Sequence, residues 1–331
     1  MIARVADNCF WFGRYVERAE STARLLQVTR SLSFDAEISV AQCWQPVVIV
    51  SGEYPAFLKR FTAEQGGDAS LVQEYTTWDA ENHVSLWSSI RAAREAARTI
   101  RDVLSGEVWE EVNELYLWMS RPVGRAEYDR DRDDFYRRVR RAGQLSLGLV
   151  RSTMLRESPL AFLWLGVMLE RSIQVARILD MHHHTLSGEN PHKIVDLNLW
   201  LALLRACSGY EPFMRRCRGQ VTRSGVLDFL LFEAAFPRSI RYCTKVARRL
   251  VTELFPGAAR EPGSPGFAAY KRIDELNRWL DERRTPGSPS LRHGIHELLT
   301  HVVDESGEIC GVLGRDMMGP QVVTQTQSQS Q

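Results

Sequence analysis

Two Glu-Arg dipeptides stand inside long apolar segments, where charged side chains are rare and chemically informative. The segments are 10–26, FWFGRYVERAESTARLL, and 163–179, LWLGVMLERSIQVARIL, and both contain the pattern G-x-x-x-E-R. The charges concerned are Glu17 and Arg18 in the first segment and Glu170 and Arg171 in the second. On a helical wheel these charges fall among large apolar side chains, and the second segment is apolar on nearly every side. We therefore expect two long helices at the centre of the fold.

Charges in such surroundings must be paired, because an isolated charge in an apolar interior is very costly. One interpretation is a set of salt bridges between the two helices that fixes their register. The other is a polar pocket between the helices, in which arginines hold a carboxylate or phosphate by paired hydrogen bonds. The candidate anion- or ligand-binding residues are Arg14, Glu17, Arg18, Glu170, Arg171, Arg94, Asn113 and Arg238. The same wheel places Glu20 and Arg24 on a narrow outward face, where a change at Glu20 would cost little.

Helical periodicity dominates the rest of the chain and predicts an all-α fold. Long helices are predicted at 3–31, 85–105, 107–120, 130–155, 158–183, 238–255 and 267–283, and shorter ones at 41–50, 55–63, 197–207 and 225–232. Residues 47–50 are rich in β-branched side chains, but one candidate strand cannot make a sheet, so this stretch is assigned to a helix.

The chain also resembles itself. Four blocks in the first half match four blocks in the second half, in the same order and at an offset of 153 to 164 residues. The blocks at 10–26 and 163–179 share seven identical positions. Such in-register matches predict an internal duplication. We expect a duplicated multi-helix bundle with two equivalent long central Glu-Arg helices, with repeats at 1–152 and 153–318 fused as one domain and a disordered tail at 319–331.

Other clusters of histidine and acidic residues give weaker signals for metal binding. Asp180 and His184 are one helical turn apart and could hold one edge of a metal site, but basic residues also suit the negative end of a helix dipole. His296 and His301 lack the HExxH spacing of zinc hydrolases. The aspartates at 129–134 lack the glycine and glutamate of a calcium loop. Nucleotide-binding and serine-hydrolase motifs are absent from the sequence, and we predict no catalytic residue, no metal and no cofactor.

Composition limits the cellular compartments and the classes of partner that we expect. The 331 residues carry 42 Lys and Arg against 41 Asp and Glu, a net charge of +1, which gives no global basic field to attract nucleic acid or acidic lipid. No apolar run reaches the roughly 20 residues of a membrane span, and Arg4, Asp7 and Arg14 interrupt any signal sequence. Six cysteines without a CxxC pair are expected to be reduced core residues. We predict a cytoplasmic protein that binds neither nucleic acid nor membrane.

Three segments together resemble the bacterial alpha-E family over almost the whole chain: FWFGRYVERAESTARLL, AAREAARTIRDVLSGEVWEEVNELYLWM and FLLFEAAFPRSIRYC. The resemblance implies an all-helical cytoplasmic protein, and its motif is matched here by Glu17 and Arg18, with Glu170 and Arg171 in the second copy. It also implies two partners, a circularly permuted ATP-grasp amide ligase and a transglutaminase-like peptidase, and no activity for the alpha-E protein itself. Val167 replaces Arg14 in the second copy, so an anion site there would be weaker.

Two functions follow as hypotheses. The first is a non-catalytic accessory or scaffold of an ATP-grasp ligase in peptide synthesis or modification, which binds an anionic peptide or metabolite at its Glu-Arg residues. The alternative is an enzyme, an amide-bond transferase or hydrolase, in which a buried Glu acts as acid or base and Arg groups clamp an oxyanion or carboxylate. A closed Glu-Arg cluster favours the scaffold, whereas an open pocket lined by these groups favours ligand binding or catalysis.

Overall fold

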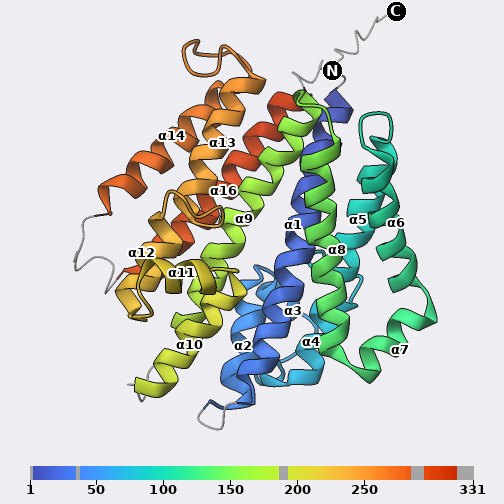
Figure 1. Cartoon of the computed structure of the whole chain (residues 1–331), viewed down its shortest axis with the longest axis vertical. Helices are drawn as coiled ribbons and strands as arrows, with labels where there is room; N and C mark the ends of the chain where they lie inside the picture. Colours follow the sequence, from blue (N-terminus) through green and yellow to red (C-terminus); the bar gives the residue numbers. More distant parts are fainter. Residues whose placement is uncertain (1–2, 35–37, 186–192, 285–293, 319–331) are drawn as a thin grey trace, which may run out of the picture.

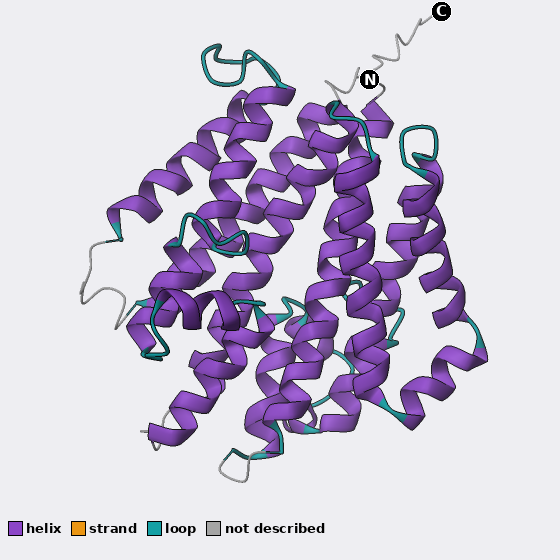
Figure 2. Cartoon of the chain, viewed as in Figure 1, coloured by secondary structure: helices purple, strands orange, loops and turns teal. Residues whose placement is uncertain are grey.

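All regular secondary structure in the described part of the chain is helical. The computed structural model describes residues 3–34, 38–185, 193–284 and 294–318, and Figure 2 shows helices joined by loops throughout them. The helices are α1 (Ala3–Leu32), α2 (Val40–Val50), α3 (Tyr54–Phe57), η1 (Glu64–Gly67), α4 (Ala69–Thr77), α5 (Leu86–Thr99), α6 (Gly106–Ser120), α7 (Pro122–Arg130), α8 (Arg132–Thr153), α9 (Ser158–Thr185), α10 (Lys193–Ala206), α11 (Tyr210–Arg216), α12 (Arg223–Phe232), α13 (Ile240–Leu254), α14 (Phe267–Glu282) and α16 (Ile295–Met318). The all-α prediction is confirmed for these residues, including 47–50, which end α2.

The two Glu-Arg helices, α1 and α9, form the centre of the bundle (Figure 1). They pack against each other, with α5 and α8 on the free side of α1 and α13 and α16 on the free side of α9. Helix α2 also packs on α9, and α10 packs on α1. Because α1 is enclosed by α5, α8, α9 and α10, it is buried on most of its sides, and both predicted repeats contribute to one continuous hydrophobic core.

Capping residues set the helix starts that the sequence predicts. The Ser85 hydroxyl accepts a hydrogen bond from the Ser88 backbone N–H and caps α5, and Ser239 does the same for α13 through Tyr242. Asp131 caps α8 by accepting from the backbone N–H groups of the two residues at its second and third helical positions. Such caps stabilise a helix by about 1 kcal/mol each because they satisfy otherwise unpaired N–H groups.

Several boundaries differ from the prediction. The helix expected at 55–63 covers only Tyr54–Phe57, and the one expected at 85–105 ends at Thr99. Helices α4, α7, α11 and α16 are missing from the predicted set. The first three have nine residues or fewer and give little periodic signal, whereas α16 has 24 residues. The division at 152/153 stays a prediction, and the tail at 319–331 lies outside the described residues. Within the described ranges, no helix is both long and apolar enough to cross a membrane.

Glycines bring α1 and α9 together at their crossing. A Cβ added at Gly13 would collide with the carbonyl oxygen of Leu163, and one added at Gly166 would collide with the carbonyl oxygen of Phe10. The two contacts are reciprocal, since each helix presents its motif glycine to the backbone of the other. This close approach brings the following turn of each helix, which carries Glu and Arg, next to the partner helix.

We expect Gly13→Ala and Gly166→Ala each to lower the free energy of unfolding by about 1–3 kcal/mol, because the added methyl forces two backbones apart. The matched control is Gly148→Ala, at a helical position on α8 with nothing within 4 Å of the added Cβ. That control should raise stability by about 0.5–1 kcal/mol. Urea unfolding of the three variants checks this, and equal effects at all three positions would contradict the close approach.

Candidate functional site: the Glu-Arg cluster

Glu170 of α9 is enclosed by donors from α1. Its carboxylate accepts from Arg18 Nε at 2.7 Å and Nη2 at 2.9 Å, from Arg14 Nε at 2.9 Å, and from Gln174 Nε2 at 2.9 Å. The residue has no exposed surface. The Arg14 guanidinium also lies over the Trp11 ring, 4.7 Å from its centroid, which fixes its orientation. Both carboxylate oxygens are therefore saturated by protein donors.

Glu17 of α1 has the corresponding arrangement with residues of the second half. Arg171 donates to it in a bidentate manner, Nε to Oε1 at 2.9 Å and Nη2 to Oε2 at 2.7 Å. Arg238, which lies just before α13, adds a bond from Nη1 to Oε1 at 2.8 Å. Glu17 is also fully buried. The two motifs thus exchange partners, because each motif glutamate binds the motif arginine of the other helix.

Electrostatics keep both glutamates ionised. Burial alone would raise the pKa of the Glu170 carboxyl, but the charges of Arg18 and Arg14 outweigh burial and lower that pKa well below its usual range. For Glu17, burial likewise acts to raise the pKa, and Arg171 and Arg238 lower it overall. A carboxyl group whose pKa is lowered in this way has no proton to donate at neutral pH and is a weak base.

The outward placement of Glu20 and Arg24 was wrong. Both side chains are buried, because α8 packs on this face of α1 and Gly143 lets the Glu20 side chain approach it closely. Glu20 forms an ion pair with Arg24 and accepts from Arg238 Nη2 at 3.0 Å and from Gln144 Nε2 at 3.1 Å. Glu20 is therefore a third glutamate of the cluster, joined to Glu17 through Arg238.

Arg94 and Asn113 lie apart from the cluster. Arg94 Nε donates to Asn113 Oδ1 at 2.9 Å, and its guanidinium lies 4.5 Å from the Tyr116 ring centroid. These contacts join α5 to α6. Of the eight predicted residues, the structure brings together Arg14, Glu17, Arg18, Glu170, Arg171 and Arg238.

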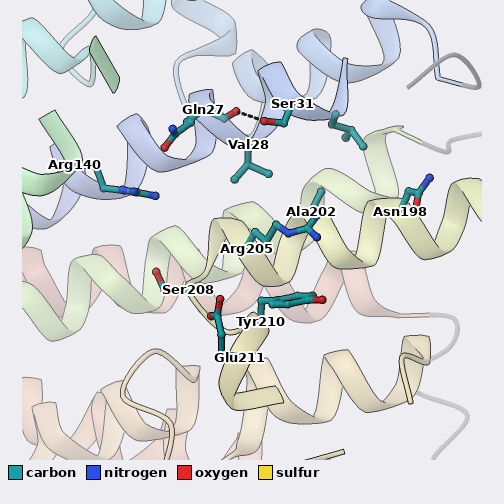
Figure 3. A pocket seen from close by; sticks show the side chains of 11 residues that line it. Gln27, Val28, Ser31, Arg140, Asn198, Ala202, Arg205, Ser208, Tyr210 and Glu211 are labelled. Carbon is teal, nitrogen blue, oxygen red and sulfur yellow. Dashed lines mark hydrogen bonds between the residues drawn. The ribbon is translucent and has the colours of Figure 1, made fainter. Parts of the chain in front are cut away.

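Sequence reasoning missed the arginine-lined cleft beside the cluster. A cavity of about 540 Å³ opens between α1, α8, α10 and α11 (Figure 3). Its lining residues include Gln27, Arg140, Arg205, Tyr210 and Glu211. Nothing in the residue spacing singled out Arg140 or Arg205, because the two arginines lie on different helices.

The two arginines of this cleft are uncompensated. In the described part of the chain neither Arg140 nor Arg205 pairs with a carboxylate, and Arg140 Nε is buried without a hydrogen-bond partner. Burial, together with the charges of Arg141 and Arg137, lowers the pKa of Arg140. Figure 3 shows the two guanidinium groups reaching the cleft from different helices. Neither guanidinium is paired with a carboxylate of the described residues, although that of Arg205 lies over the Tyr210 ring, 4.9 Å from its centroid. An anion that enters the cleft could therefore bind both.

Comparison with known proteins assigns the family. The alpha-E family, described as a predicted alpha-helical domain with a conserved ER motif, matches residues 1–317. The chain belongs to the alpha-E family. Glu17–Arg18 and Glu170–Arg171 are the Glu-Arg dipeptides of its two long helices, and their exchanged salt bridges give such a motif a physical reason.

Relatives of this alpha-E chain occur in mycobacteria. It is 27% identical over 332 residues to uncharacterized proteins of Mycobacterium tuberculosis and Mycobacterium bovis. The match covers 94% of this chain but 36% of each relative, so the chain spans about a third of their length. No solved structure matches it.

Burial of Glu20 leads to a prediction opposite to that of the helical wheel. Glu20→Gln removes the charge that compensates Arg24 and part of Arg238, and we expect a loss of about 3–5 kcal/mol of unfolding free energy. Glu74→Gln is the control, because the Glu74–Arg125 pair is nearly half exposed on both sides, and should cost less than about 1 kcal/mol. The free energies of unfolding are measured by chemical denaturation. A loss for Glu20→Gln as small as that for Glu74→Gln would contradict the buried pairing.

Proposed function

We propose that this alpha-E chain is a non-catalytic helical scaffold that serves as an accessory of an ATP-grasp amide ligase in peptide synthesis or modification. The observation that carries the proposal is the saturation of Glu17 and Glu170, each fully buried and bonded by two arginines. A general acid or base needs a pKa near the working pH, whereas both carboxyl pKa values are lowered. The enzyme alternative is therefore the weaker one.

The partners rest on the family resemblance alone. The circularly permuted ATP-grasp ligase would supply the energy for amide-bond formation, and the transglutaminase-like peptidase would act on the same class of peptide. The alpha-E chain would contribute a rigid surface and a binding cleft, and no step of the chemistry would require its own nucleophile, metal or cofactor.

We further infer that the fold arose by internal duplication, which would create its symmetric cluster. Three features that occur in both halves of the chain support this. The glycines Gly13 and Gly166 each meet the other helix's backbone, and the two motifs exchange Glu-Arg bonds. In addition, the hydroxyls that cap α5 and α13 donate to carbonyls six residues upstream, Ser85 to Asp79 at 2.8 Å and Ser239 to Glu233 at 2.7 Å.

An anionic peptide or metabolite would bind in the cleft between α1, α8, α10 and α11 rather than in the closed cluster. Arg140 and Arg205 supply two uncompensated guanidinium groups, and Gln27 and Tyr210 supply neutral polar groups beside them. A cavity of about 540 Å³ accommodates a short peptide terminus or a small metabolite. Glu211 at its edge would select for ligands that carry a cationic group as well as an anionic one.

Reconstitution tests the proposal. The chain is mixed with a circularly permuted ATP-grasp ligase of the kind that the family resemblance implies, and ATP-dependent amide formation is measured with and without the chain. We expect the chain alone to be inactive and to raise the ligase rate. Arg140→Gln and Arg205→Gln should reduce that stimulation several-fold at an unchanged Tm, while Arg91→Gln, at an exposed position of α5, should leave it unchanged.

Arg14→Lys separates architecture from chemistry. Lysine keeps the positive charge but lacks the planar guanidinium that binds Glu170. We therefore expect a lower Tm, and a loss of ligase stimulation no larger than the loss of folded protein explains. An Arg14→Lys chain that melts like the wild type but no longer stimulates the ligase would make the cluster a functional site and refute the scaffold. Amide formation or hydrolysis by the chain alone, without the ligase, would also refute the scaffold.

A further inference from the structure

Three metal-ligating side chains from two helices meet far from the Glu-Arg motifs. Asp180 and His184 lie in the last turns of α9, and His296 lies in the first turn of α16. Asp180 Oδ2 is 3.2 Å from His184 Nε2, and Asp180 Oδ1 is 2.8 Å from His296 Nδ1. One ligand atom from each of the three residues lies within 4.8 Å of the others. The carboxylate thus stands between two imidazole nitrogens.

Among the described residues, no lysine or arginine forms an ion pair with Asp180. Its side chain is only 14% exposed, and it lies near the carboxyl end of α9, where the helix dipole is negative and disfavours an anion. Among the described residues, its salt-bridge partners are the two histidines. A carboxylate and the negative end of a helix dipole therefore meet at this position.

The donor types select the kind of cation. Two imidazole nitrogens and one carboxylate oxygen are typical ligands of zinc, whereas calcium and magnesium prefer oxygen ligands throughout. In a tetrahedral zinc site with bonds of about 2.0–2.1 Å, neighbouring ligand atoms lie about 3.3 Å apart. The separations of 2.8 and 3.2 Å are near that edge length, although each runs to a different oxygen of Asp180. The three ligand atoms lie within 4.8 Å of one another, so the side chains would have to turn toward a common point to hold an ion.

We propose that Asp180, His184 and His296 form a binding site for a divalent transition-metal ion of the zinc type, which clamps the end of α9 to the start of α16. Three protein ligands leave one tetrahedral position open. The His296 side chain is 40% exposed, so an ion could reach the site from solvent. The i, i+4 spacing of Asp180 and His184 provides one edge, and His296 supplies the third ligand from a helix more than 100 residues away in sequence.

The test is metal titration of the full chain after treatment with EDTA. Calorimetry with Zn²⁺ should give one saturable site per chain, and Co²⁺ should develop the intense visible absorption of tetrahedral coordination. His184→Ala, His296→Ala and Asp180→Asn should each weaken Zn²⁺ binding at least tenfold. The control is His301→Ala, on the same helix as His296, whose ring packs on Trp279 instead, and it should bind like the wild type. A 100-fold excess of Mg²⁺ should not compete.

Two results would overturn the site. One is a wild-type chain without saturable Zn²⁺ binding or without the tetrahedral Co²⁺ spectrum, which would leave a hydrogen-bonded His-Asp-His cluster only. This readout needs no variant and is independent of variant folding. The other is unchanged Zn²⁺ affinity in the His184→Ala and His296→Ala variants, which would place any binding elsewhere. Zn²⁺ should also raise the Tm of the wild type and not that of folded His296→Ala.

Discussion

The burial of three carboxylates at the crossing of two helices is the constraint on which the rest of the fold depends. Glu17, Glu20 and Glu170 have no exposed surface, and the desolvation of each costs several kcal/mol unless donors replace the lost water. Those donors come from four separate parts of the chain: α1, α8, α9 and the segment just before α13. The helices must therefore approach at one position and in one register.

The contact glycines and the charges act together in setting that register. Gly13 and Gly166 permit a backbone contact that any side chain would block, and that contact brings each motif glutamate within reach of the opposite motif arginine. A shift by one helical turn would leave both carboxylates buried and unpaired. Apolar packing alone tolerates such slips, so the buried ion pairs provide specificity rather than a large net stabilisation.

The central part of this arrangement could be predicted from the sequence, whereas the contacts that depend on neighbouring helices could not. Burial and pairing of Glu17 and Glu170 followed from charges inside apolar periodic segments. Glu20 was misplaced because a wheel drawn for one helix cannot show that α8 covers its polar edge. The cleft between Arg140 and Arg205 and the contact of His296 with Asp180 were missed for the same reason, since each joins helices that are distant in sequence. Arg94 and Asn113 do contact each other, but they join α5 to α6 outside the cluster.

The Glu-Arg cluster and the cleft proposed for ligand binding occupy different places in this alpha-E chain. The conserved Glu-Arg motif lies in a closed cluster with saturated carboxylates, while the uncompensated arginines lie in the adjoining cleft between α1, α8, α10 and α11. A closed, paired cluster gives the charged motif a structural role, and the proposal directs a search for ligands to the cleft.

A double-mutant cycle between Arg18 and Glu170 tests the central claim most directly. Arg18→Met, Glu170→Met and the double variant are unfolded in urea, and their free energies are compared with the wild type. If the pair fixes the helix crossing, the double variant should be more stable than the sum of the single losses by about 1–3 kcal/mol. Losses that add to within about 0.5 kcal/mol would show that the two side chains do not act as a pair and would contradict the account.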